Sequence, residues 1–265
     1  MADPSWDPIV TPWHLDEHLP AFPVPVGATG PIRPDLPAGT VPARMGLLHR
    51  AVADAVADAV ARAVRPLVLS GDCPTARATV AGLQRRHRDV AVVWLDAHGD
   101  FNTPVISTSG YLGGMALAML TGRTPDLFDD GLGLRPVPES GVVLADARDL
   151  DPAERDALTG SRVRRVPADP AAVTAALAGL RGTPVYLHLD IDVVDSADLP
   201  GLRFPSGTGP SLTRIAECLA ATCATADVRA AGIACAWLPE HVGDPTTRPA
   251  ITTLAGALGA DLRWP

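Results

Sequence analysis

Residues 90–100, VAVVWLDAHGD, and residues 184–192, PVYLHLDID, are the two stretches that decide the fold. Each begins with a mostly apolar run and ends in acidic residues spaced two apart. A short apolar run with no polar face is typical of a strand in a parallel sheet that helices cover on both sides. Ligands of such sheets bind beyond the carboxyl ends of the strands, so the acidic residues stand where a functional site is expected.

The rest of the chain alternates between helical and strand patterns. The pattern predicts helices over residues 43–64, 75–86, 113–120, 151–158, 170–180, 213–223 and 251–259. It predicts the other strands over residues 65–71, 141–146, 162–168 and 229–238. This order predicts a three-layer α/β/α fold with a central, mostly parallel sheet, in a single domain over residues 43–265.

Residues 1–42 differ in composition from the rest, because they hold ten of the 27 prolines. Proline lacks the backbone N–H that a helix interior needs, so this segment cannot run as a helix. We expect it to form an extended N-terminal arm that packs on the domain.

Composition and charge exclude several classes of function. The 30 acidic residues outnumber the 22 basic ones, which argues against a nucleic-acid partner. All basic residues are arginine, so lysine Schiff-base chemistry is excluded. The apolar stretches are broken well before 18 residues, and the start of the chain has no basic or apolar segment typical of a signal peptide. We therefore expect a soluble, cytoplasmic protein with no membrane partner.

Five metal-ligating side chains follow the two decisive strands: Asp96, His98, Asp100, Asp190 and Asp192. Residues spaced two apart in an extended segment project to one side, so these side chains can converge. Four carboxylates in one cleft repel each other and take up protons unless cations are present. We therefore expect this cluster to bind hard divalent metal ions.

A third strand end, residues 69–73, places the thiol of Cys73 at the same edge of the sheet. A lone cysteine is more often a small buried apolar residue than a ligand. The position of Cys73 beside an acidic cluster keeps both interpretations open.

These segments resemble the arginase or ureohydrolase superfamily. The matching text is LDAHGDFNTPVISTSGYLGGMALAML over residues 95–120, ADARDLDPAE over 145–154 and LHLDIDVVDS over 187–196, with SGDC at 70–73 in the place of the family's GGDH. The resemblance covers about residues 66–240. It implies a two-manganese site whose bridging hydroxide attacks a guanidinium carbon.

Carried over to this chain, the resemblance implies two ligand sets that share Asp96 and Asp190. One metal ion would take these two residues with Cys73 and Asp100, and the other would take them with His98 and Asp192. Manganese is the expected ion, and the softer thiolate admits Zn²⁺ or Fe²⁺ as alternatives.

The resemblance also implies contacts to an amino-acid-like substrate. Asn102 and Ser109 match contacts to its carboxylate, and Asp151 and Glu154 match acids that receive its α-amino group. The sequence DPAE equally predicts a helix start, with Asp151 as the N-cap and Glu154 in the first turn. Both interpretations stay open.

Two further departures from the family's pattern concern catalysis. Gly113 replaces the family's proton-shuttling histidine, so the leaving group must be protonated by Asp100, His188 or bulk water. His188 is otherwise a hydrogen-bonded core histidine. Trp237 aligns with the family's guanidinium-binding glutamate, where it would offer a cation–π face or belong to the core.

The sequence therefore predicts a metal-dependent hydrolase that cleaves a non-peptide C–N bond in a linear amidine. The Cys73 and Gly113 departures resemble a divergent branch near the N-hydroxyarginine amidinohydrolases. The expected substrate is a small nitrogen-rich molecule, either a guanidine or a modified guanidine. The alternative is a catalytically silent protein that keeps the fold for binding or regulation.

Overall fold

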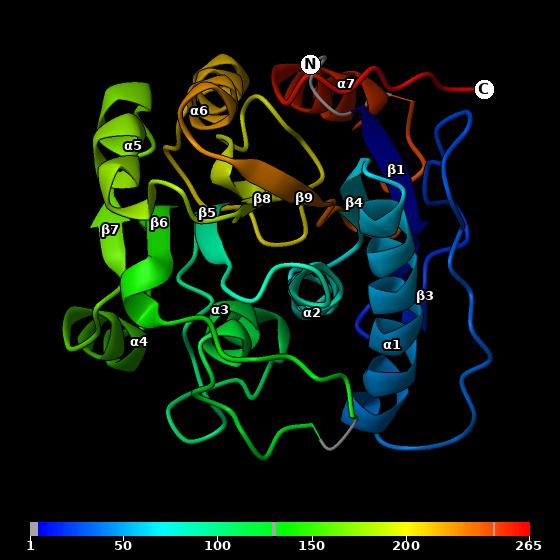
Figure 1. Cartoon of the computed structure of the whole chain (residues 1–265), viewed down its shortest axis with the longest axis horizontal. Coiled ribbons are helices and arrows are strands. Elements are labelled where there is room, and N and C mark those ends of the chain that lie inside the picture. The colour runs from blue at the N-terminus through cyan, green and yellow to red at the C-terminus, as the bar shows by residue number, and fades with distance from the viewer. Residues whose placement is uncertain (1–4, 129–130, 246) are drawn as a thin grey trace.

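Seven strands form one parallel sheet in the order β1-β4-β9-β8-β5-β6-β7 (Figure 1). The structure is a computed structural model that describes residues 5–128, 131–245 and 247–265. The strands are β1 Trp6–Thr11, β4 Arg65–Ser70, β5 Ala91–Asp96, β6 Val142–Asp146, β7 Arg164–Val166, β8 Val185–Asp190 and β9 Val228–Ala234. Every pairing in this sheet is parallel, which confirms the predicted sheet.

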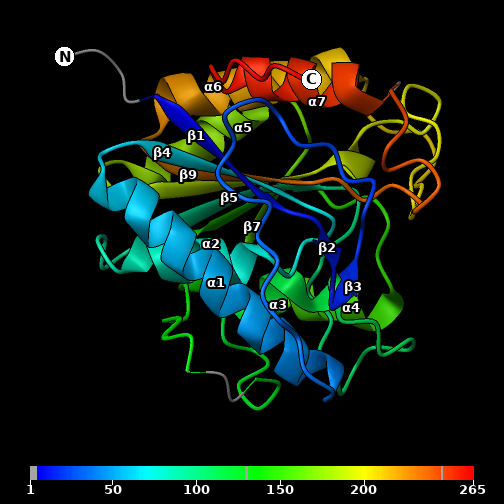
Figure 2. The same ribbon diagram turned by 90° about the vertical axis from the view of Figure 1, so that its right-hand side faces the viewer.

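Helices cover both faces of the sheet, as Figure 2 shows. One layer contains α5 Pro170–Leu177, α6 Leu212–Thr225 and α7 Thr247–Ala257. The other contains α1 Val41–Ala61, α2 Ala76–Gln84, α3 Ala116–Leu120 and α4 Pro152–Thr159. Short 3-10 helices lie at η1 Gly113–Met115, η2 Glu139–Gly141, η3 Ala178–Leu180 and η4 Ile191–Val193. The predicted three-layer α/β/α fold is confirmed.

The alternation of side chains along the central strands divides the core in two. In β5, Val93 and Leu95 pack with α5, α6 and α7, whereas Val92 and Trp94 pack with α2 and α3. Successive residues of a strand point to opposite faces, so both faces need apolar residues. This explains why the two decisive runs are apolar throughout.

The N-terminal segment does more than pack on the domain, because β1 extends the central sheet. It pairs with β4 from Trp6 opposite Arg65 to Thr11 opposite Ser70. Pro8 lies within β1, and an edge strand tolerates proline because one side of its backbone needs no ladder partner. A short hairpin, β2 Trp13–His14 with β3 Glu17–His18, follows. The division of the chain at residue 42 stays a prediction.

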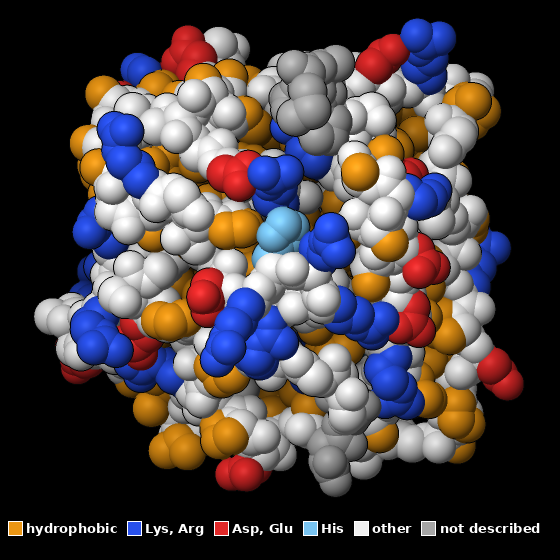
Figure 3. Space-filling model, in the orientation of Figure 1, with side chains coloured by type: hydrophobic (Ala, Val, Ile, Leu, Met, Phe, Trp, Pro, Cys, Tyr) orange, Lys and Arg blue, Asp and Glu red, His pale blue; other side chains and the backbone are white. Residues whose placement is uncertain are grey.

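Arginine side chains gather at the centre of the face seen in Figure 3, around a histidine. Arg65, Arg86, His87 and Arg229 line a hollow at the start of β4 and β9. The hollow therefore lies where these strands begin, opposite the carboxyl ends that carry the acidic residues. None of the helices in the described ranges has both the length and the apolar character needed to cross a membrane.

A glycine sets the approach of the two helices that begin the second layer. A Cβ at Gly82 of α2 would lie 2.6 Å from the Ala53 carbonyl oxygen and 2.8 Å from Val56 of α1. We expect Gly82→Ala to lower the free energy of unfolding by about 1–3 kcal/mol, because the helices must move apart. Urea unfolding measures this change.

Gly256 of α7 supplies the matched control, because a Cβ there would meet no atom within 4 Å. Gly256→Ala should raise the free energy of unfolding by up to about 1 kcal/mol, as helix propensity favours alanine. If Gly82→Ala also stabilised the protein, the close packing of α1 on α2 would be wrong.

Candidate metal centre

The two strand ends that the sequence singled out lie side by side. β5 ends at Asp96 and β8 ends at Asp190, and these strands are neighbours in the sheet. The His98 backbone amide donates to Asp96 Oδ1 at 2.7 Å, and the Asp192 amide donates to Asp190 Oδ1 at 3.0 Å. The Trp94 indole donates to Asp96 Oδ2 at 3.0 Å. Both carboxylates are therefore held in fixed orientations.

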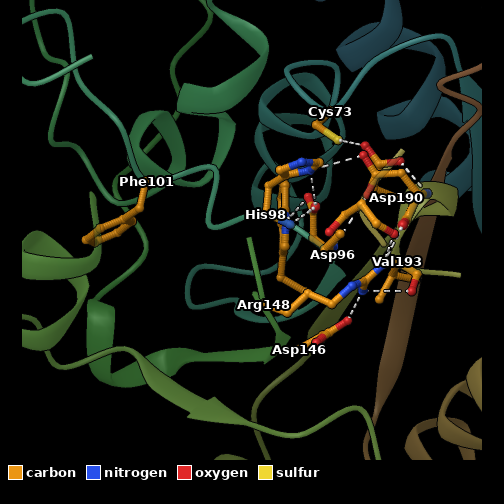
Figure 4. Close-up of polar contacts among 12 residues, drawn as sticks. Cys73, Asp96, His98, Phe101, Asp146, Arg148, Asp190 and Val193 are labelled. Atoms are coloured by element: carbon orange, nitrogen blue, oxygen red, sulfur yellow. Dashed lines mark hydrogen bonds and ion pairs between the residues drawn. The ribbon is translucent and has the colours of Figure 1, made fainter. Parts of the chain in front are cut away.

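Three predicted ligands form a first group with ligand atoms within 4.8 Å of one another, namely Cys73, Asp96 and Asp100. Asp190 joins this group, because the Cys73 thiol donates to Asp190 Oδ2 at 2.8 Å (Figure 4). The structure thus brings together the four residues of the first predicted ligand set. Cys73 is a member of the cluster and not an isolated core residue.

A second group shares Asp96 with the first. Ligand atoms of Asp96, His98 and Asp192 lie within 4.8 Å of one another. His98 Nδ1 is 3.1 Å from Asp192 Oδ2 and 3.5 Å from Asp96 Oδ1. All six predicted metal ligands therefore meet at this edge of the sheet, with Asp96 common to both groups.

Burial makes this concentration of acidic groups costly. Asp96 and Asp192 are 1% exposed, Asp100 is 5% exposed and Asp190 is 6% exposed. Burial, reinforced by neighbouring carboxylates, raises the pKa of Asp100 and Asp190 well above the usual range and that of Asp192 to about 7. Burial and the nearby carboxylates also raise the pKa of the Cys73 thiol. The cluster therefore holds protons unless cations replace them.

The same carboxylates favour the protonated form of His98. Burial by itself lowers the pKa of His98, but the contacts with Asp192 and Asp96 outweigh burial and raise the pKa to about 12. A protonated imidazole here partly neutralises two carboxylates. A divalent ion would do so more completely and would bind the neutral ring.

The residues present fit a pair of divalent cations. Asp100 Oδ2 is buried and makes no hydrogen bond to any residue that the structure describes. Carboxylate oxygens and an imidazole nitrogen suit ions such as Mn²⁺, and a deprotonated Cys73 adds a softer ligand. Cys73 Sγ lies 2.8 Å from Asp190 Oδ2, so a cation that binds between these two candidate ligands would replace their hydrogen bond.

The cluster faces a cavity of about 290 Å³. The predicted ligands that line it are Cys73, His98, Asp100, Asp190 and Asp192. The predicted substrate-binding residues that line it are Asn102, Ser109, Asp151 and Glu154. The cavity therefore joins the candidate metal centre to four of the five expected substrate contacts.

The segment after β5 and the start of α4 meet in the wall of this cavity. Asn102 Nδ2 donates to Asp151 Oδ2 at 3.3 Å, and Glu154 Oε1 accepts from the Phe101 amide at 2.8 Å. Asp151 stands at the N-cap position of α4, but its side chain makes no capping hydrogen bond. The acidic side chains of this segment are thus used by the cavity wall and not by the helix start.

An arginine fixes the loops beneath the cluster. Arg148 pairs with Asp146 and donates to the carbonyl oxygens of Val193 at 3.0 Å, Asp192 at 3.3 Å and Ser206 at 3.1 Å (Figure 4). These contacts tie the loop after β6 to the loops that follow β8. The position of Asp192 therefore depends on a half-buried guanidinium that binds its backbone carbonyl oxygen.

His188 does not support the catalytic role expected for it. It is 1% exposed and does not line the cavity. Its ring stacks on Trp94 with centroids 3.6 Å apart, and its Nδ1 lies 2.9 Å from the Tyr186 hydroxyl. Burial lowers the pKa of His188 to about 3, so the ring is neutral. It is the core histidine of the alternative interpretation, packed behind Asp96.

Comparison with known proteins identifies the family of this chain. The sequence profile described as the Arginase family matches residues 20–248. The chain belongs to the arginase family. It is 35% identical over 149 residues to N(omega)-hydroxy-L-arginine amidinohydrolase from Streptomyces lavendulae, covering 56% of this chain and 53% of that protein. The expected resemblance to the superfamily is confirmed.

The chain is also similar to arginases. An arginase from Staphylococcus aureus strain COL is 31% identical over 147 residues, covering 51% of this chain and 48% of that protein. The match thus spans about half the length of these curated relatives. The crystal structure of arginase from Bacillus cereus has a TM-score of 0.73 at 29% identity, covering 81% of this chain and 77% of that one.

The predicted substrate contact at Trp237 is wrong, because this side chain is 3% exposed and packs in the core on the α5 side of the sheet. The preceding residue, Ala236, lines the cavity instead. Adjacent residues of an extended segment face opposite ways, so an offset of one residue exchanges core and cavity. The segment after β9 therefore presents a methyl group to the cavity.

Sequence reasoning missed two residues that fill the place left by Gly113. A Cβ at Gly113 would overlap the ring of Tyr111, so this ring occupies the space of the family's histidine side chain. The Tyr111 hydroxyl lies 3.0 Å from His14 Nε2, and both residues line the cavity. The SGYLGG segment gave a weak signal for Tyr111, since two glycines leave room for a neighbouring ring. No local pattern could have pointed to His14.

Metal stoichiometry tests this centre. We expect the purified protein, loaded with Mn²⁺ and then dialysed, to bind about two ions per chain. Asp96→Asn should reduce binding below one ion, because both groups share Asp96. Asp192→Asn should remove one ion and leave the other. Elemental analysis by mass spectrometry gives the counts.

Asp149→Asn is the matched control, because Asp149 lines the cavity but belongs to neither ligand group. It should leave the ion count unchanged. Equal losses in all three variants would contradict the assignment of Asp96 as the shared ligand.

Proposed function

We propose that this protein is a metal-dependent hydrolase that cleaves a non-peptide C–N bond in a linear amidine. The observation that carries the proposal is the convergence of six metal-ligating side chains at one edge of the sheet, five of them in the wall of one cavity, in a member of the arginase family. The substrate is a small amino-acid-like molecule with a guanidino or modified guanidino group.

The cofactor in this proposal is a pair of divalent ions, with Mn²⁺ expected and Zn²⁺ or Fe²⁺ as alternatives because of Cys73. Asp96 and Asp190 would be shared between the ions, Cys73 and Asp100 would complete one site, and His98 and Asp192 would complete the other. Two ions held in this way would supply a hydroxide nucleophile at neutral pH by lowering the pKa of bound water.

The cavity wall beside the centre suits the amino-acid end of the substrate. Asn102 Oδ1 is buried without a hydrogen-bond partner among the described residues, so it can accept a bond from a substrate N–H. Asp151 and Glu154 add acidic groups that would attract an α-ammonium group, and Ser109 offers a hydroxyl at the outer rim. These residues orient the substrate so that its C=N carbon faces the metal ligands.

The part of the cavity lined by Ala236 suits a guanidine of low charge. A buried guanidinium without a carboxylate partner costs several kcal/mol, and Ala236 provides no carboxylate. An N-hydroxyguanidine is less basic than a guanidine and can bind as the neutral form. The similarity to a protein that is described as acting on hydroxyarginine agrees with this choice. We therefore propose N-hydroxyguanidino amino acids as the preferred substrates.

A catalytically silent binding protein is the second candidate. Gly113 and Ala236 favour it, since the family's proton shuttle and its guanidinium carboxylate are both replaced by side chains without polar groups. The two candidates differ in a direct way: the hydrolase turns over a substrate when loaded with metal, and the binding protein does not.

Substrate discrimination tests the proposal. We expect the Mn²⁺-loaded protein to release hydroxyurea from Nω-hydroxy-L-arginine with a kcat/KM at least about tenfold above that for L-arginine. Ala236→Glu should lower KM for L-arginine by about 10- to 100-fold, because a charged hydrogen bond in a buried site contributes about 1.5–3 kcal/mol. Steady-state assays of hydroxyurea release from Nω-hydroxy-L-arginine and of urea release from L-arginine measure these constants.

Ala236→Gln is the control for size, since it fills the same space without charge and should leave KM for L-arginine high. No turnover of any guanidino, N-hydroxyguanidino or formimino acid by protein that binds two ions would exclude the hydrolase and favour the binding protein.

A further inference from the structure

We propose that Tyr111 and His14 form a proton relay that serves the leaving group of the reaction. Tyr111 is the catalytic residue, because it lines the cavity where the scissile bond would lie, and His14 is the positioning residue that holds its hydroxyl. This inference rests on the proposed hydrolysis and names the groups that take the place of the missing histidine.

Hydrogen bonds define the direction of the relay. His14 Nδ1 is 2.9 Å from the Gly71 carbonyl oxygen, which can only accept, so Nδ1 carries a proton. His14 Nε2 is then free to accept from the Tyr111 hydroxyl at 3.0 Å. The rings are nearly parallel, with an angle of 13° and centroids 6.0 Å apart. A continuous path thus leads from the cavity to an imidazole nitrogen.

The pair is built into the wall of the metal centre. His14 is 5% exposed, and the neighbouring Leu15 amide donates to Asp72 Oδ2 at 2.5 Å. Asp72 is next to the ligand Cys73, so the N-terminal hairpin is fixed to the loop that supplies this ligand. Burial raises the pKa of Tyr111, and the nearby Asp72 and Cys73 raise it further, so the hydroxyl keeps its proton.

The position of Tyr111 follows from Gly113. Any side chain at residue 113 would overlap the Tyr111 ring, so the ring can take this position only because residue 113 is glycine. Phe204 packs on the other side of the ring, with centroids 5.1 Å apart, and limits its movement. The hydroxyl is therefore held at the site that a shuttle would occupy.

The reaction leaves Tyr111 and His14 with the same number of protons that they had at the start. The attacking hydroxide forms from water before it adds to the C=N carbon, and the proton released then goes to solvent. When the C–N bond breaks, its electron pair goes to nitrogen. The Tyr111 proton transfers to that nitrogen, and His14 Nε2 passes a proton from solvent to the Tyr111 oxygen. Water loses one proton, the amine gains one, and both residues regain their initial state.

The test separates leaving-group protonation from a structural role. An amine leaves carbon only after its nitrogen is protonated, whereas a thiol with a pKa of about 8.5 leaves as the thiolate. Two substrates are compared, Nω-hydroxy-L-arginine and its analogue in which sulfur replaces the nitrogen of the scissile bond. Tyr111→Phe should lower kcat for the nitrogen substrate by about 10²- to 10⁴-fold with KM within threefold, and for the sulfur analogue by less than threefold.

Tyr186→Phe is the matched control, because it removes a hydroxyl that is buried outside the cavity. It should leave the ratio of the two rates unchanged, whatever its effect on each. A loss in Tyr111→Phe that is equal for both substrates, or a loss below threefold for the nitrogen substrate, would overturn the relay. If the wild-type protein with two bound ions hydrolyses neither substrate, the proposed hydrolysis itself fails and the inference fails with it.

A second measurement needs no metal. In the metal-free protein, the ¹⁵N chemical shifts of His14 should show a protonated Nδ1 and an Nε2 that accepts a hydrogen bond. Tyr111→Phe should move the Nε2 signal downfield, towards that of an unbonded ring nitrogen, while Tyr186→Phe leaves it in place. A proton on Nε2 instead of Nδ1, or an Nε2 signal that ignores Tyr111→Phe, would contradict the relay.

Discussion

The repulsion among buried carboxylates is the constraint on which the rest of the structure depends. Asp96 and Asp190 end two neighbouring strands with almost no access to water, and further acids follow each of them. Such groups cannot all ionise in a dry site without cations. The backbone amides that orient them and the Arg148 contacts beneath them hold this unfavourable arrangement in place. The tight apolar packing of both faces of the sheet supplies the rigidity that this requires.

The sequence predicted what local patterns determine. The apolar runs and the polar residues that follow them led to the sheet and to five candidate ligands, since strand ends of a parallel sheet meet at one edge, and the family resemblance added Cys73. The missed features depend on long-range contacts: β1 joins the sheet despite Pro8, and His14 meets Tyr111 across 97 residues of sequence. The error at Trp237 is a shift of one residue, which reverses the side of the strand.

Three departures from the family's pattern act on the same reaction. A thiolate at Cys73 adds negative charge to the centre and lowers the Lewis acidity of any ions that bind there. Ala236 removes the charged partner of a guanidinium, and Gly113 removes a shuttle while it admits the Tyr111 ring. Together they agree with the proposal of a less basic substrate whose leaving amine receives its proton from Tyr111.

Anomalous X-ray scattering from crystals of the Mn²⁺-loaded protein tests the central claim most directly, because it locates ions without any assumption about activity. The account predicts two peaks about 3.5–4 Å apart with Asp96 between them. One peak should lie at bonding distance from the Cys73 sulfur, which then no longer donates to Asp190. A cluster without peaks, with the thiol still hydrogen-bonded to Asp190 at saturating Mn²⁺, would contradict it.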